Sequence, residues 1–393
     1  MKKSKTEITE SNIRKIYLFN IVSSLEFTAS VFALYLLANG LNMTEVMLLE
    51  SAYMIILLLT EIPSGALADT LGRKNALAGA MILLGGAFII FAKGTAFWTF
   101  FLANAVAAVA IATWSGADSA FIYDTLKTAG KEKEYGTVFG KALFFSMMGL
   151  AVASLAGGFM AARLGYRNVF FITAATFGAA SIFALALKEP ALEERRKTVR
   201  EYLSKLKQAT KFAVTHSRVR SLIIYYSVFA GITHLAWFII QPYYDNSGLP
   251  KYFVGIAVFT YFGFAGLGHY LGERLSRMLK EKQLTRALLG IAAVSFTAMK
   301  FAGPIAGIFL IAAMSLVSGV RDVFVSREVN RKTESKYRAT VESVVEMGKG
   351  VAYAVLAIVF GRITDIAGPE NTLLAMGVIL AAFTLYNPEA DKE

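Results

Sequence analysis

The sequence of 393 residues contains no cysteine, only three histidines and only 17% charged residues. The absence of cysteine excludes disulfides and thiolate metal sites, and His216, His234 and His269 cannot form a metal cluster by themselves. The sequence also lacks a nucleotide-binding loop and a nucleophile placed beside a base, which argues against an enzyme. We therefore expect no catalytic residue, no cofactor and no metal site.

Hydrophobic residues make up 56% of the chain, and the mean hydropathy is +0.53. A helix of about 20 apolar residues crosses roughly 30 Å of hydrocarbon. Twelve such segments recur, at 16–38, 46–64, 75–92, 96–118, 139–162, 168–187, 219–243, 252–273, 285–300, 303–325, 339–361 and 370–387. We predict an all-α integral membrane protein with twelve transmembrane helices, of which the ninth is short.

The net charge of +12 is distributed unevenly over the two sides of these spans. Of the 40 Lys and Arg residues, 33 fall on one side and six on the other. The positive-inside rule then predicts a multi-pass protein of the cell membrane with both termini in the cytoplasm. The basic excess would contact anionic lipid headgroups, and nucleic-acid binding is a poor interpretation of it.

The longest polar stretch, 188–218, lies close to mid-chain and predicts a linker between two six-helix halves, 1–187 and 219–393. Its Leu203, Leu206 and Ala213 suggest an amphipathic helix on the membrane surface. A regulatory role is one interpretation of this helix. A solvated tether is the simpler one.

The two halves also echo each other in sequence, because an offset of 203 residues superposes Ser115-Gly116 on Ser318-Gly319. Two of the superposed pairs exchange charge, Asp118 with Arg321 and Asp124 with Arg327. These charges could attract the halves to each other on the cytoplasmic side.

A charged turn follows the second apolar segment, Gly65-Ala66-Leu67-Ala68-Asp69-Thr70-Leu71-Gly72-Arg73-Lys74. It resembles the signature loop of the major facilitator superfamily, G-x-L-A-D-x-x-G-R-K, and every fixed position is present. The chain looks like the drug:proton antiporter members of that family. The resemblance implies two pseudo-symmetric six-helix bundles, secondary active transport by alternating access, and a substrate site between the bundles near the midplane.

In the resembled family the turn stabilises the outward-facing state through contacts with helices 4 and 11. The helix 4 partner corresponds to Asp124, so we predict that Arg73 pairs with it as a state-dependent latch. Anchoring of the turn to headgroups is the alternative. Pro63 is expected to end the second span, and the remaining members of the latch are expected to be Glu61, Gly65, Asp69, Gly72 and Lys74.

Glu26 is the sharpest candidate within the membrane, because it lies near the middle of the first span. It would share one helical face with Ser23, Ser30 and Ala33. A buried carboxylate costs at least about 2.5–3.5 kcal/mol at that depth, so it should face water, find a partner or carry a proton. We expect a proton carrier, with a structural hydrogen bond as the alternative.

Polar and aromatic stripes follow three further spans, and in the resembled fold spans 1, 4, 7 and 10 line the cavity. The stripes comprise Asn104, Ile111, Ser115 and Asp118 on span 4, Tyr226, His234, Trp237 and Gln241 on span 7, and Ser315, Ser318 and Asp322 on span 10. Such a pocket suits an organic cation or an amphipathic molecule. Packing of the aromatic rings against lipid or other helices is the alternative.

Span 11 begins with Glu342, Glu346 and Lys349 on one helical face. The plausible partners of these charges are Arg321, Arg338 and His269. The cluster is either a cytoplasmic gate or a second protonation site, and we favour the gate. His269 alone is more often a satisfied structural residue.

Two family patterns are incomplete. Efflux members carry G-x8-G-x3-G-P-x2-G-G in helix 5, whereas this chain has Gly140, Gly149, Ala153, Ser154, Gly157 and Gly158 at those positions. Small residues there still permit close helix packing. Asn104 stands where the family's helix 4 has an arginine, so proton coupling would fall to Glu26, with Asp118 as a second candidate.

We therefore predict proton-coupled export of an amphipathic or cationic organic compound by a monomer that contacts membrane lipids. Symport of a small polar nutrient with protons is the close alternative, and sodium is an alternative coupling ion. A non-transporting membrane receptor is a third interpretation, which the intact turn and the polar stripes argue against.

Overall fold

The computed structural model describes the chain except for residues 1, 191–209, 211–214, 216, 333–337 and 386–393. Within the helices, no side chain is described at 2–6, 62, 65–67, 69, 217–219, 330, 332, 338–340, 342 and 385. The predicted amphipathic helix with Leu203, Leu206 and Ala213 lies outside the described residues, and the division of the chain at a central linker stays a prediction.

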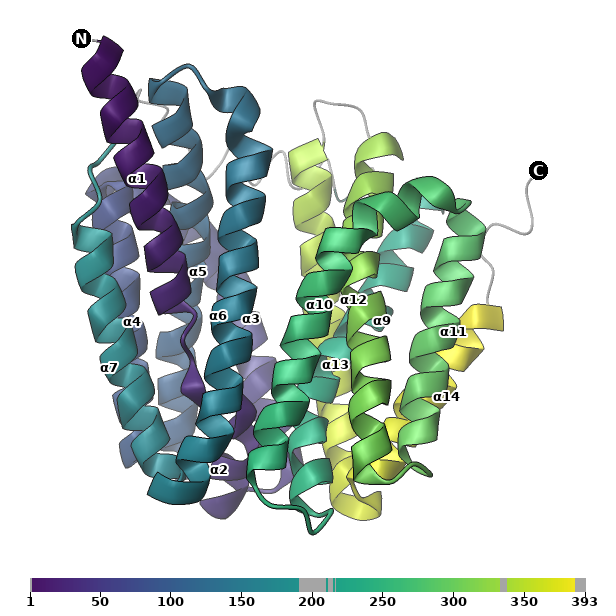
Figure 1. The fold of residues 1–393 in the computed structure, drawn as a ribbon. Helices are drawn as coiled ribbons and strands as arrows, with labels where there is room; N and C mark the ends of the chain where they lie inside the picture. Colours follow the sequence, from purple (N-terminus) through teal and green to yellow (C-terminus); the bar gives the residue numbers. More distant parts are fainter. Residues whose placement is uncertain (1, 191–209, 211–214, 216, 333–337, 386–393) are drawn as a thin grey trace. The chain divides into compact units, whose positions relative to one another are not determined.

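The described chain is helical throughout (Figure 1). The first half contains α1 (Lys2–Ser23), the 3-10 helix η1 (Phe27–Ser30), α2 (Phe32–Ala38), α3 (Met43–Leu71), α4 (Arg73–Lys93), α5 (Phe97–Thr128), η2 (Glu132–Glu134), α6 (Tyr135–Leu164) and α7 (Tyr166–Leu185). The second half contains α9 (Ser217–Asp245), α10 (Tyr252–Met278), α11 (Glu281–Met299), α12 (Pro304–Lys332), α13 (Arg338–Ala367) and α14 (Pro369–Leu385).

Each predicted span corresponds to a helix or to a bent pair of helices. Nine helices in the described part are long and apolar enough to cross a membrane, and the pair Glu7–Ser30 and Phe32–Ala38, bent by 42°, forms a tenth. The helix α14 is apolar but short, and α11 begins with the charged residues Glu281, Lys282 and Arg286. The prediction of an all-helical membrane protein is confirmed.

The expectation that Pro63 ends the second span is wrong, because α3 continues through Pro63 to Leu71. A proline removes one intrahelical hydrogen bond, which membrane helices tolerate when hydroxyl side chains and neighbouring helices satisfy the backbone locally. Two hydroxyls near Pro63 add bonds to the helix backbone on either side of it, Thr60 Oγ1 to the Ile56 carbonyl at 2.7 Å and Ser64 Oγ to the Glu61 carbonyl at 2.9 Å.

The chain divides into two compact units. Unit 1 contains Met1–Val31 and Ala52–Val199, and unit 2 contains Phe32–Ser51 and Arg200–Glu393. In unit 1, α4 packs against α5 and α7. Their shared core is aromatic and comprises Phe88, Phe91, Phe100, Phe170 and Phe177.

The first span is not one continuous helix, since α1 ends at Ser23 and a break precedes η1. No proline or glycine in the sequence marks this break. The backbone around the break lies close to α6, where a side chain at Gly157 would overlap the Phe27 carbonyl and one at Gly149 would lie 3.0 Å from the Ile21 carbonyl. The incomplete glycine pattern of span 5 therefore accommodates the backbone of the broken first span.

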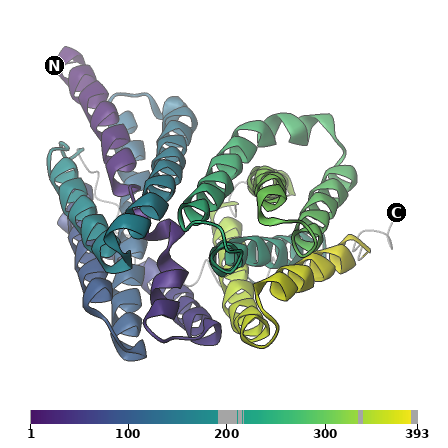
Figure 2. The same cartoon turned by 60° about the horizontal axis from the view of Figure 1, so that its bottom comes forward.

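In unit 2, α12 is surrounded by α9, α10 and α11 (Figure 2). The closest approach is between α10 and α12: a side chain at Gly268 would overlap the Leu316 carbonyl, and one at Gly319 would overlap the Ala265 carbonyl. Small residues permit such backbone contact in membrane helices. This packing determines which polar side chains of the two helices meet.

Candidate functional site

The signature turn is built around Gly72, which ends α3 and caps α4 with φ 86° and ψ 149°. Only glycine adopts this backbone region at low cost. A side chain there would also lie 3.1 Å from the carboxyl carbon of Glu189. The Glu189 carboxylate accepts hydrogen bonds from the backbone N–H of Arg73 at 2.6 Å and of Lys74 at 2.9 Å. Glu189 thus supplies the N-terminal cap of α4.

Glu189 is held in place by α1. The Asn12 side chain donates to the Lys188 carbonyl at 2.8 Å and accepts from the Lys188 N–H at 3.0 Å. Lys15 Nζ donates to the Ala186 carbonyl at 2.8 Å. The segment that follows α7 is therefore bonded to α1 at Ala186 and Lys188. Glu189, the next residue in the chain, reaches the signature turn.

The side chain of Arg73 lies beside Asp124 of α5, as we predicted, with 3.5 Å between Nε and Oδ2. Both side chains are largely buried, at 15% and 22% exposure. Glu61 is exposed, whereas the predicted latch residues Gly65 and Asp69 have no described side-chain environment. The role of the pair as a latch stays a prediction.

Glu26 lies within the break of the first span, and Thr28 Oγ1 donates to its Oε1 at 3.3 Å. The expected helical face shared by Ser23, Glu26, Ser30 and Ala33 is wrong, because no continuous helix connects these residues. Ser30 Oγ is buried and has no hydrogen-bond partner among the described residues. Discontinuous membrane helices commonly carry substrate and ion sites, so Glu26 keeps its place as a candidate on different grounds.

A second buried carboxylate of unit 1, Asp118, is 8% exposed. It accepts a hydrogen bond from Asn20 Nδ2 of α1 at 3.2 Å, and Ser146 Oγ of α6 donates to Asn20 Oδ1 at 3.1 Å. On the predicted stripe of span 4, Asn104 is also buried whereas Ser115 is exposed. Asn20 and Ser146 were missed, although an amide in an apolar span was a usable signal.

The densest polar cluster of unit 2 centres on Arg321 and Asp322 of α12. Arg321 Nη2 and Nε donate to Asp322 Oδ1 at 2.7 and 3.0 Å, and His269 Nε2 of α10 lies 3.1 Å from Asp322 Oδ2. Arg321 Nη1 donates to Thr233 Oγ1 of α9 at 2.6 Å, and Ser318 Oγ donates to the same atom at 3.2 Å. Three helices therefore converge on one ion pair.

This cluster differs from the predicted gate. Arg321 and His269 contact Asp322 instead of Glu346, because the close packing of α10 on α12 brings His269 beside Asp322. Glu346 pairs with Lys349 at 2.5 Å and accepts from the Tyr226 hydroxyl at 3.0 Å. The side chain of Glu342 and that of Arg338 lie outside the described residues.

Aromatic rings cover the two cations of the cluster. The Arg321 guanidinium lies 4.8 Å from the Phe229 ring centre and 5.6 Å from that of Tyr226, and Lys349 Nζ lies 5.9 Å from the Tyr226 ring. Arg321 is 4% exposed, whereas the side chains of Asp322 and His269 are 35% and 40% exposed. The cluster thus joins a buried cation to groups that water can reach.

The remaining stripe of span 7 separates into two environments. His234 is exposed, and its ring lies 5.2 Å from that of Tyr353 and 6.1 Å from that of Trp237. Gln241 is completely buried and accepts a hydrogen bond from the Ala33 N–H at 2.9 Å. Gln241 therefore contributes to helix packing, and its expected role in the pocket stays a prediction.

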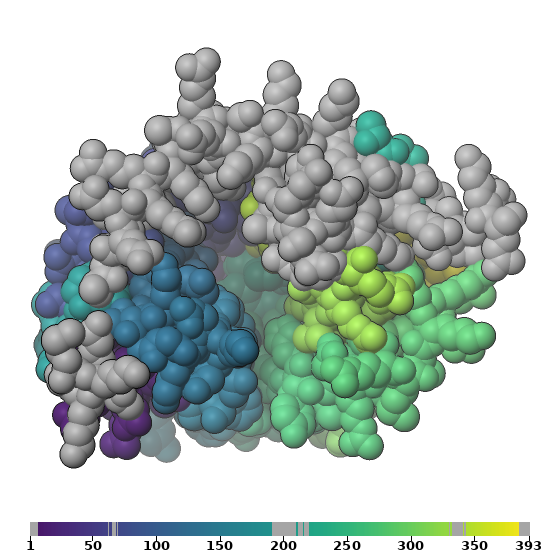
Figure 3. All heavy atoms as spheres, turned by 90° about the horizontal axis from the view of Figure 1, so that it is seen from above, coloured from purple at the N-terminus to yellow at the C-terminus, as the bar shows by residue number. Residues whose placement is uncertain are grey.

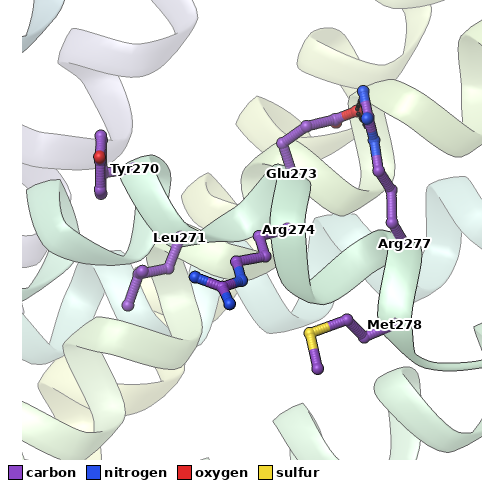
Figure 4. Close-up of a pocket in the computed structure, with 6 residues that line it drawn as sticks. All are labelled: Tyr270, Leu271, Glu273, Arg274, Arg277 and Met278. Carbon is purple, nitrogen blue, oxygen red and sulfur yellow. Dashed lines mark hydrogen bonds and ion pairs between the residues drawn. The ribbon is translucent and has the colours of Figure 1, made fainter.

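A surface pocket of about 650 Å³ lies at the carboxyl end of α10, beyond His269 (Figure 4). Arg277 pairs with Glu273 at 2.8 Å, and the side chains of Leu271, Arg274 and Met278 point away from that pair. Figure 3, viewed from the side of the amino terminus, shows the connection between α10 and α11 (green) at the surface. All six lining residues come from one helix, so this pocket lacks the convergent polar groups of a solute site.

Comparisons with known proteins agree with this architecture. The family model described as Major Facilitator Superfamily matches residues 16–333. The chain belongs to this superfamily of membrane transporters. No curated protein matches the sequence.

Two solved structures are similar in fold. A mutant form of the nucleoside transporter NupG gives a TM-score of 0.81 at 15% identity, covering 96% of this chain and 99% of that one. Another structure of NupG gives a TM-score of 0.78 at 16% identity, covering 95% and 97%. The drug:proton antiporter branch that we expected is not supported by these comparisons, which share the fold alone.

Proposed function

We propose that this transporter moves a small polar solute into the cell together with protons. The observation that carries the proposal is the chain of contacts Thr233–Arg321–Asp322–His269 in unit 2. It offers hydrogen-bond donors and acceptors around an ion pair. A site of that kind discriminates in favour of solutes with matching hydroxyl, amide or carbonyl groups.

The charge of the cluster argues against the organic cation that the sequence favoured. Arg321 and Lys349 are both cations, and each lies over the ring of Tyr226. Asp322 and Glu346 balance these two charges. A cationic substrate would nevertheless have to displace one of the cations from the ring of Tyr226, whereas a neutral solute would not.

His269 provides a group through which protons can be coupled to the solute. Protonated His269 would compete with Arg321 for Asp322, and so would loosen the ion pair and free guanidinium donors for the solute. The surroundings also contain Lys349 and Glu346 of α13, which form an ion pair, and the Tyr226 hydroxyl of α9, which donates to Glu346.

The fold neighbours make nucleosides the first solutes to test, since both are structures of a nucleoside transporter. We would reconstitute the purified protein in liposomes and measure uptake of uridine and adenosine with and without an inward proton gradient. Amino acids, sugars and lipophilic cations complete the panel. We expect gradient-driven accumulation of a polar solute that Asp322→Asn abolishes. The control Glu273→Gln removes an exposed carboxylate of α10 and should transport normally.

Export of an amphipathic cation remains the second candidate, because the carboxylate of Glu26 lies in the break of the first span beside Thr28. Extrusion of preloaded lipophilic cations by an inward proton gradient that depends on Glu26 and is indifferent to Asp322→Asn would overturn the import proposal in favour of export. Absence of any transport across the panel, with binding of a panel compound intact, would favour a receptor.

A further inference from the structure

The amino terminus of α3 is capped by a residue from the opposite end of the sequence. Asp365, near the end of α13, accepts hydrogen bonds from the backbone N–H of Met43 at 2.8 Å and of Thr44 at 2.9 Å. Its Oδ2 also accepts from the Thr44 hydroxyl at 2.5 Å. Asp365 therefore satisfies the first two backbone donors of the helix and places a negative charge at the positive end of its dipole.

The helix has a local cap as well, and the two do not overlap. Asn42 Oδ1 accepts from the Glu45 N–H at 2.9 Å, and Glu45 Oε2 accepts from the Asn42 N–H at 2.9 Å. This reciprocal capping box satisfies the third donor of the helix and leaves the first two free. Those two donors are the ones that Asp365 takes, so the α3 terminus is complete only while it is docked on α13.

Further contacts fasten the same segment to α13. A side chain at Gly361 would lie 2.9 Å from the Met43 carbonyl and 3.0 Å from the Met47 side chain, so the two backbones touch. About one turn beyond Met47, Ser51 Oγ donates to the Ala354 carbonyl at 2.8 Å, and Glu50 accepts from the Tyr353 hydroxyl at 3.4 Å.

The short helix α2 docks on α9 in a similar manner. The side-chain oxygen of Gln241 accepts a hydrogen bond from the backbone N–H of Ala33, the second residue of α2. The ring of Phe32 lies edge-on to that of Phe238, with 6.3 Å between centres. Residues 32–51 are thus held to unit 2 by helix caps, buried hydrogen bonds and apolar contacts.

The rest of spans 1 and 2 belongs to unit 1, which contains Met1–Val31 and Ala52–Val199. The segment 32–51 leaves unit 1 at the break after η1 and returns within α3. By the positive-inside rule this segment lies at the outer ends of its spans. Residues 32–51 therefore belong to unit 2, whereas the residues before and after them in the first two spans belong to unit 1. They lie on the predicted outer side.

We propose that Asp365 is the positioning residue of an outer gate: it holds residues 32–51 on unit 2, and their release gives the outer side access to the transport path. The proposal rests on alternating access, the mechanism of the proposed function, and not on the solute. Release would expose two backbone donors of α3 and the buried side chain of Met47, which is 0% exposed.

The absence of cysteine in the chain makes a direct test straightforward. A single Met47→Cys reporter would be labelled on intact cells with a membrane-impermeant maleimide, and the rate compared with and without Asp365→Ala. Loss of a charged cap changes an opening equilibrium by about five- to thirtyfold, so we expect the labelling rate to rise by that factor. Gly361→Val should raise it as well, because it removes the backbone contact while leaving Asp365 in place.

Two controls separate gating from general loosening. Glu370→Gln removes a carboxylate at the first turn of α14 and should leave labelling of Met47→Cys unchanged. A reporter at Ala103→Cys in α5, which is also 0% exposed, should stay protected in every variant. If Asp365→Ala gives no monodisperse protein, Asp365→Asn, which keeps one acceptor oxygen, takes its place with an intermediate effect.

An unchanged rate in well-folded Asp365 and Gly361 variants would overturn the proposal. So would an equal rise at Met47→Cys and Ala103→Cys, since the carboxylate would then serve only stability. Because labelling requires no solute, a failure of the gate is distinguishable from a failure to find transport of nucleosides or other panel compounds.

Discussion

The cap that Glu189 places on α4 gives a prediction whose size follows from the geometry. Glu189 accepts two backbone N–H bonds of 2.6 and 2.9 Å at the start of the helix. Losing an N-cap costs about 0.5–2 kcal/mol, and the interaction of a carboxylate with the helix dipole adds about 0.3–1 kcal/mol. Because Glu189 is exposed to solvent, which screens the charge, we expect Glu189→Ala to cost about 1 kcal/mol locally.

Hydrogen exchange measures this cost at the affected amides. A loss of about 1 kcal/mol corresponds to roughly fivefold faster exchange through local opening, and peptides that contain Arg73 and Lys74 should show it. Glu189→Gln keeps an acceptor oxygen and should give a smaller effect. The matched control Glu132→Gln removes an exposed carboxylate elsewhere in unit 1 and should change nothing there.

Unchanged exchange in Glu189→Ala would refute the reasoning, because it would mean that water caps these amides equally well. Faster exchange in peptides of α5 and α7 too would indicate a general loss of stability. Gly72→Ala provides an independent check, since its backbone region costs a non-glycine residue about 1–3 kcal/mol.

Three further substitutions test other parts of the structure. Gly157→Ala should lower the thermal stability by about 1–3 kcal/mol because its methyl group overlaps the Phe27 carbonyl; Gly140→Ala on the same helix has open space and should be neutral, and equal effects would contradict the packing. Asp322→Asn should cost about 2 kcal/mol in detergent melts by leaving Arg321 buried without its counter-charge, and a variant as stable as the parent would show that the pair is not needed. Glu26→Gln should abolish proton-driven transport if Glu26 carries the proton; transport that persists would end that assignment.

The pair of Arg73 and Asp124 was predicted from the resemblance of the turn to the family's signature loop, whose helix 4 partner corresponds to Asp124. The structure places the two side chains beside each other. The same resemblance could not reveal Glu189. That residue is more than one hundred positions from the turn, and the hydrogen bonds go to backbone N–H groups that every residue carries.

The broken first span shows a different limit of sequence reasoning. Helical spacing put Glu26, Ser30 and Ala33 on one face, but the spacing holds only within a continuous helix. The broken backbone packs against Gly149 and Gly157 of α6, which lie more than a hundred residues away. A local pattern therefore gave a wrong neighbourhood to a residue that it had singled out for its charge.

The partner of His269 could not be read from the sequence for a similar reason. A single histidine near the end of a span carries little information in the sequence, and we regarded it as a structural residue. Glycines at 268 and 319 bring α10 and α12 into backbone contact, and this contact sets the imidazole 3.1 Å from Asp322. The polar residues were recognisable, but their pairing depended on the packing of two helices.

Apolar segment length, charge asymmetry and the signature turn determined by themselves that this protein is a helical membrane transporter, because those properties depend on composition along the chain. Which carboxylate caps which helix, where the first span breaks and which cation faces which acid were decided only by tertiary structure. Contacts at separations such as the 322 residues between Met43 and Asp365 arise when helices pack, and no local pattern encodes them.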